Sequence, residues 1–199
     1  MRHFTYKTLD ELEQAARQLG AEQVRFQHDT AKMQAALARP VAVGPRAAGN
    51  SMAIHPMEGC DGTLDGRPAE LTWRRYERFA HGGAKLIWFE ATAIREDGRA
   101  NTRQILLNSR TVDEYARLYE MMQRVHREAW GTTDDLLIPI QLTMSGRYSV
   151  PVKTIAYHNP LIDQKSGTPA DFPVISDDEL ERLEDVYVDA TGLALQAGF

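Results

Sequence analysis

The sequence has little of what would place the chain outside the cell, in a membrane or on a nucleic acid. It contains one cysteine, Cys60, which has no partner for a disulfide within the chain. The N-terminus carries no apolar core of signal-peptide type, and no run approaches the roughly 18 apolar residues that cross a bilayer. The 23 basic and 28 acidic residues give a formal charge of −5 and are mixed along the chain, which argues against nucleic acid as the main partner. We expect a soluble, cytoplasmic protein.

Two compact motifs are also missing. No G-x-G-x-x-G occurs, because Gly59 and Gly62 stand in a long loop ahead of Pro68, and this argues against a doubly wound dinucleotide-binding fold. No H-x-H or similarly compact set of ligands marks a metal site. What is present is an ordinary globular composition, in which 43% of the 199 residues are hydrophobic. That is enough for one domain or for a large part of a bigger one.

Four helix starts are marked by local chemical signals. At three of them a hydroxyl residue is followed three positions later by glutamate, the capping-box pattern, and at the fourth a proline suits the first turn. Apolar residues at helical spacing follow each start, and glycines provide plausible stops. The start signals are Thr8 with Glu11, Pro68, Thr111 with Glu114, and Ser176 with Glu179, and the stops are Gly20, Gly82 and Gly131.

Short apolar runs lie between these helices. They are Met52 to Met57, Leu86 to Ala91 and Leu136 to Leu142. Runs of this length that are apolar on both faces predict parallel strands covered on both sides. Pro139 conflicts with a central strand, because it removes one donor from the hydrogen-bond ladder.

The order of elements predicts a parallel α/β architecture. Connections from helix to strand are short, whereas those from strand to helix are long, so the long loops should face one mouth at the carboxyl ends of the strands. We favour a partial (β/α)8 TIM barrel. Residues 1–40 would be an N-terminal helical extension, and residues 41–199 would form about the first three strand-helix units, truncated before the fourth strand.

Three segments resemble the old yellow enzyme family when they are taken together. They are HPMEGCDG from His55, PAELTWRRYERFAHGGAKLIWFEATAI from Pro68 and QLTMSGRYS from Gln141, in the right order and at barrel spacing. The resemblance implies an FMN-dependent NAD(P)H oxidoreductase on a (β/α)8 barrel, of ene-reductase or dienoyl-CoA reductase type. It implies NADH or NADPH as reductant and an activated alkene or enoyl-CoA as substrate. A homo-oligomer is an open alternative to a monomer.

The resemblance also implies one side of an FMN site at the strand ends. A flat ring needs a floor of backbone and small side chains, and Ala91 leaves room for it, while the amide of Gln141 matches the donor-acceptor edge of the flavin pyrimidine. On the residues alone, Gln141 could equally be an ordinary polar strand end. The implied cofactor residues are His55, Pro56, Met57, Glu58, Ala91 and Gln141. No catalytic acid is assigned.

Two substitutions and the length depart from the family pattern. Met144 stands where the family usually has a histidine, and Ser51 where it has an arginine. The family's substrate-holding histidines and its phosphate-binding loops would lie beyond Phe199. We therefore expect the isolated chain to carry part of the flavin bed and not to turn over.

Two other functions remain open from the sequence. The first is a metal-dependent barrel lyase or hydrolase, because strand-end carboxylates and a histidine suit hard cations. Its ligands would be His55, Glu58, Asp61 and Glu90. The second is a truncated product without catalytic activity, since open strand edges favour partner binding or aggregation.

Overall fold

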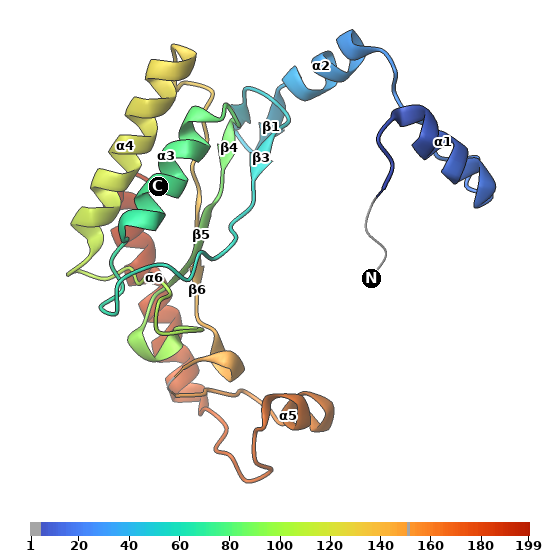
Figure 1. Cartoon of the computed structure of the whole chain (residues 1–199). Coiled ribbons are helices and arrows are strands. Elements are labelled where there is room, and N and C mark those ends of the chain that lie inside the picture. The colour runs from blue at the N-terminus through green and yellow to red at the C-terminus, as the bar shows by residue number, and fades with distance from the viewer. Residues whose placement is uncertain (1–4, 151) are drawn as a thin grey trace.

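A computed structural model describes residues 5–150 and 152–199, which form an N-terminal arm and an α/β body (Figure 1). The arm holds α1 (Leu9–Gln18) and α2 (Thr30–Ala38) and extends away from the body (Figure 1). Thr8 caps α1 as predicted, its Oγ1 accepting from the Glu11 amide at 3.2 Å. The helix α2 was not predicted, and it buries none of its residues.

A small antiparallel hairpin follows the arm. It pairs β1 (Val41–Val43) with β2 (Arg46–Ala48). Gly44 has a φ of 57°, a left-handed conformation that glycine adopts without steric cost at a tight turn. The sequence did not predict this hairpin, because its two strands are only three residues long.

The three predicted strand segments lie side by side in chain order. β3 (Ala53–Ile54) runs parallel to β4 (Leu86–Ile87), and β5 (Phe89–Ala93) runs parallel to β6 (Ile140–Thr143). β4 and β5 are one stretch of chain interrupted at Trp88, whose amide donates to the carbonyl of Ile54 at 3.1 Å. The described strands do not close into a barrel.

The regular strands are shorter than the sequence predicted, and proline is the reason in two places. Pro139 lacks the amide hydrogen that a parallel ladder needs, so regular pairing begins only after it, at Ile140, although its carbonyl accepts from Phe89 at 2.7 Å. Near Pro56 the chain leaves the ladder in a local turn, in which the amide of Met57 donates to His55 at 2.8 Å.

Three helices cover one side of these strands (Figure 1). They are α3 (Glu70–His81), α4 (Val112–Trp130) and α6 (Asp177–Ala197). Of the predicted caps, Ser176 is confirmed, since its Oγ accepts from the Glu179 amide at 3.2 Å. Thr111 is the N-cap residue of α4 as predicted, but its hydroxyl does not cap the helix and instead donates to the Leu106 carbonyl at 2.7 Å. Pro68 precedes α3 rather than lying in its first turn.

The core lies between the strands and the three helices. Phe89 stacks on Tyr76 of α3 at a ring-centroid distance of 4.2 Å and meets Phe199 edge-on at 5.0 Å. Ile140 and Leu142 of β6 pack against the same core. Because side chains alternate along a strand, the residue between them projects from the other face of the sheet.

The long strand-to-helix loops leave the same end of the parallel strands, as predicted (Figure 1). They contain two short 3-10 helices, η1 (Glu96–Gly98) and η2 (Gly146–Tyr148), and the helix α5 (Pro160–Ser166). Within the described ranges, no helix combines the length and apolarity needed to span a bilayer.

Candidate functional site

Ala91 and Gln141 lie next to each other, but two residues before the ends of β5 and β6 rather than at the strand ends as predicted. They are register partners in the β5–β6 pair, and both are half-buried. Gln141 stands between two core-facing residues of β6, so its side chain projects from the face of the sheet that the helices leave uncovered. No residue in the described part of the chain hydrogen-bonds the side-chain amide of Gln141. The amide is therefore available to a ligand.

The segment from His55 to Glu58 runs along the neighbouring strand end. Before it, Ile54 accepts from the amide of Trp88, and after it the amide of Gly59 donates to Glu90 Oε2 at 2.7 Å. The segment is thus fixed at both ends to β5 and its approach. Met57 within it is 75% exposed.

Glu58 is held by a neighbour that the sequence did not single out. Asn101, from the loop after β5, donates its Nδ2 hydrogens to Glu58 Oε1 and to the sulfur of Cys60, the latter at 3.3 Å. The Cys60 thiol also lies 3.4 Å from Glu58 Oε1. Burial and the Glu58 carboxylate raise the pKa of the Cys60 thiol, which keeps it protonated at neutral pH.

A buried ionic cluster anchors the first loop to β5. The Arg75 guanidinium of α3 bonds Asp61 from the loop and Glu90 from β5, and Glu90 is only 1% exposed. Burial raises the pKa of Glu90, while the amide of Gly59 and the Arg75 charge oppose that rise. Both carboxylates are therefore occupied by a protein cation.

This cluster counts against a metal centre at the strand ends. Asp61 and Glu90 bond Arg75, and Glu58 bonds Asn101, so these carboxylates do not face a shared vacant position. Across residues 5–150 and 152–199, three potential ligands converge at one place, in the N-terminal arm. They are Asp10, Glu13 and His28. The predicted set His55, Glu58, Asp61 and Glu90 does not form such a group.

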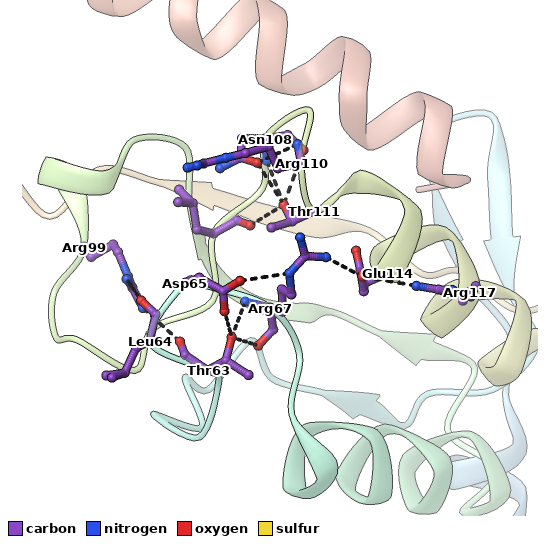
Figure 2. A network of polar contacts seen from close by, with 11 residues as sticks. Thr63, Leu64, Asp65, Arg67, Arg99, Asn108, Arg110, Thr111, Glu114 and Arg117 are labelled. Carbon is purple, nitrogen blue, oxygen red and sulfur yellow. Dashed lines mark hydrogen bonds and ion pairs between the residues drawn. The ribbon is translucent and has the colours of Figure 1, made fainter.

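Arginine side chains link the loop after β5 to the loop after β3, and the loop after β3 to α4 (Figure 2). Arg99 is 2% exposed and donates to the carbonyls of Leu64 at 2.8 Å and Gln104 at 2.9 Å. Arg67 bonds Asp65 at 2.9 Å and also Glu114 of α4, as Figure 2 shows. These bonds give both loops a fixed shape.

The side chain of Gln104 links β5 to β6 through hydrogen bonds. It is 1% exposed, and its Nε2 donates to the Ala91 carbonyl at 3.0 Å and to Thr143 Oγ1 at 3.3 Å. Its Oε1 accepts from the Ala100 amide at 2.6 Å. This role could not be predicted from the sequence, because Gln104 lies in an irregular loop without periodicity.

The third loop carries Arg147 and Tyr148, from the segment that begins at Gln141. Arg147 pairs with Asp163 and donates to the Tyr157 carbonyl at 2.6 Å, so it braces its own loop. Tyr148 is 58% exposed. Met144, which replaces the family's histidine, lies against Gly98 of the second loop. At this position an apolar contact between the second and third loops replaces the family's polar side chain.

No protein-family model and no curated protein matches the sequence. Solved structures do match: the old yellow enzyme of Pichia sp. AKU4542 has a TM-score of 0.65 at 19% identity over 82% of this chain and 44% of its own. The old yellow enzyme of Trypanosoma cruzi has a TM-score of 0.65 at 20% identity over 82% and 49%. A 2-naphthoyl-CoA reductase in complex with 2-naphthoyl-CoA has a TM-score of 0.67 at 13% identity over 83% and 26%.

Over the matched part, the chain has the same fold as these old yellow enzymes. The resemblance seen in the sequence is thus confirmed at the level of the fold. The chain spans less than half the length of the old yellow enzymes that it matches.

Proposed function

We propose that the chain is the N-terminal part of an FMN-dependent NAD(P)H oxidoreductase of ene-reductase or dienoyl-CoA reductase type. In this proposal residues 41–199 are the first three strand-helix units of a (β/α)8 barrel, and residues 1–40 are an extension. The observation that carries it is the unbonded side-chain amide of Gln141 beside the small side chain of Ala91, on neighbouring strands of a chain with this fold.

The residues present fit an isoalloxazine ring. Such a ring needs a flat surface and directional hydrogen bonds along one edge only. Gln141 would bind the pyrimidine edge with its amide, which offers both a donor and an acceptor. Ala91 would leave room for the ring, and the segment from His55 to Glu58, which follows β3, would supply the remaining contacts. The residues that would hold FMN are His55, Pro56, Met57, Glu58, Ala91 and Gln141.

When bound, FMN supplies hydride transfer from NADH or NADPH to an activated alkene or enoyl-CoA. The chain's own part is to bind and orient. Asn101 fixes the carboxylate of Glu58, and Gln104 fixes the spacing of the two strand ends. Preorganised groups of this kind lose little entropy when a ligand binds.

Lumiflavin, the ring without its ribityl phosphate, is the sharpest probe of this proposal, because it needs only the contacts that this chain would supply. We expect flavin fluorescence to change on titration with the purified chain. Gln141→Leu should weaken binding by about tenfold, the loss of one or two net hydrogen bonds. Ala91→Leu should abolish binding by filling the space of the ring.

Gln123→Leu is the matched control, because Gln123 lies on α4 and bonds only Tyr119, at 3.1 Å. It should bind lumiflavin as the wild type does. A folded wild-type chain that leaves lumiflavin fluorescence unchanged would overturn the proposal, as would equal affinity in Gln141→Leu and Gln123→Leu.

A further inference from the structure

The loop between β6 and α6 is closed by a cluster of polar side chains around Asp163 of α5. Asp163 is 8% exposed and accepts from Arg147, from the Asn159 amide at 3.1 Å and from His158 at 3.0 Å. His158 also reaches Phe172, on the chain that leads into α6. One imidazole thus joins two parts of the loop.

Both ring nitrogens of His158 face acceptors. Nδ1 lies 3.0 Å from Asp163 Oδ2, and Nε2 lies 2.9 Å from the carbonyl oxygen of Phe172. A carbonyl oxygen cannot donate, and an ionised carboxylate cannot donate either. Both contacts are hydrogen bonds only when the ring carries two protons.

Asp163 is held in its ionised form. Its burial opposes ionisation, but the bond from His158 and the charge of Arg147 outweigh this and lower the pKa of Asp163. In the described chain, two charged side chains belong to the cluster around the His158 ring. They are Asp163 and Arg147, and their opposite charges compensate each other. Lys153 is engaged nearby with the Ser166 carbonyl.

We propose that His158 is a pH-responsive clamp on this loop. As an imidazolium it holds α5 and the chain at Phe172 together, and as a neutral ring it can donate to only one of them. The bond to the neutral carbonyl is the weaker of the two, so Phe172 is released when rising pH removes the second proton from the ring. The inference does not rest on the proposed flavin site.

Release should spread to the strand-like contact beyond Phe172. There the amide of Ile175 donates to the carbonyl of Ile155 at 2.8 Å, and Val174 pairs with Ile155 in an isolated bridge. These bonds link the two ends of the loop, and they depend on the position of the chain at Phe172.

Hydrogen exchange followed by mass spectrometry tests the clamp in the full chain. After correction for the intrinsic rate, protection of residues 172–175 should fall by about tenfold or more between pH 5.5 and pH 8.0, the size of one charge-assisted hydrogen bond. Peptides from α4 should show no such fall. The protection of the α4 peptides and the circular dichroism spectrum report whether each variant is folded.

Two variants separate the clamp from a general loosening of the loop. His158→Gln keeps a donor but does not titrate, so its protection should be equal at both pH values. In Asp163→Asn the amide can donate to an unprotonated Nδ1, so the loop should stay protected at pH 8.0. His81→Gln, on the exposed end of α3, is the control and should behave as the wild type does. Wild-type protection that does not change with pH, or a pH dependence retained in His158→Gln, would overturn the proposal.

Discussion

Arg75 bonds two partly or fully buried carboxylates at once and so anchors the loop after β3 to β5. Its guanidinium bonds both Asp61 and Glu90, and these bonds hold its pKa above the usual value although burial opposes this. Removing one partner of a buried ion pair leaves an uncompensated charge, which costs more than the pair contributed.

We expect Arg75→Met to lower the free energy of unfolding by about 3–5 kcal/mol at pH 7. The loss should be smaller at pH 5, because without the guanidinium the pKa of Glu90 rises further and the buried carboxyl takes up a proton. Urea unfolding at both pH values measures this. Arg74→Met, at the exposed neighbour, should change stability by less than about 0.5 kcal/mol. Equal losses in both variants would contradict the account.

The proposed site could be found from the sequence only where residues end a strand. Ala91 and Gln141 lie at or next to the ends of apolar runs, and the structure places them in register, although two residues inside their strands. Arg75, Asn101 and Gln104 were missed, because their partners lie elsewhere in the chain and no periodicity marks them. Whether the strand-end residues hold FMN stays a prediction.

At the scale of elements, α3 and α4 are joined by a buried histidine. His126 of α4 is fully buried, and its Nδ1 donates to the carbonyl of Ala80 at 2.8 Å, while Nε2 has no partner among the described residues. Burial lowers the pKa of His126. The folded chain therefore resists a proton that the unfolded chain accepts below about pH 6.5, so stability falls as pH drops through that value.

His126→Gln keeps a donor for Ala80 and does not titrate. We expect it to lose less stability than the wild type between pH 7.5 and pH 5.0, measured by urea unfolding at each pH. The surface variant His81→Gln should keep the wild-type slope. If His126→Gln also keeps it, the buried ring is not the source of the acid sensitivity.

Two glycines test how closely α3 approaches α4. Gly83 and Gly131 have φ values of 85° and 80°, so alanine is strained at both. At Gly83 an added Cβ would also overlap the indole of Trp130, whereas nothing lies within 4 Å of one at Gly131.

Gly131→Ala should therefore cost about 1 kcal/mol of unfolding free energy, the strain alone. Gly83→Ala should cost about 1–3 kcal/mol more, since the indole must move. Thermal unfolding of the two variants side by side measures the difference. Equal melting temperatures would mean that the contact with Trp130 does not limit the packing.

The major helices and the parallel order of the strands followed from the sequence, but the extent of the strands did not. The helices α3 and α4 carry apolar stripes that the core confirms, whereas α6 reaches this core near its end, through Leu193, Ala194 and Ala197. The strands were predicted too long because Pro56 and Pro139 interrupt pairing inside apolar runs. The helix α2 was missed because it buries no residue and so shows no apolar stripe.

At the scale of the whole molecule, one face of the sheet and two strand edges are uncovered. β3 and β6 each have a single partner strand in the described chain. Trp88 is 43% exposed between two fully buried neighbours, so it projects from the face opposite the helices. Open edges and exposed apolar surface favour association of copies.

We expect the purified chain to associate as its concentration rises, measured by sedimentation velocity. Trp88→Lys should shift the chain toward the monomer, because it charges the uncovered sheet face. Leu195→Lys, at a 68% exposed position on the outer side of α6, is the matched control and should leave association unchanged. A larger effect of Leu195→Lys would place the contact on the helices instead.

The location of a bound flavin ring tests the central claim most directly. In ¹H–¹⁵N spectra of the chain titrated with lumiflavin, we expect the largest shifts at the amides of residues 55, 57, 58, 91 and 141, together with the side-chain amide of Gln141. Shifts confined to the N-terminal arm or to the helices α3 and α4 would contradict the claim that the strand ends form a flavin bed.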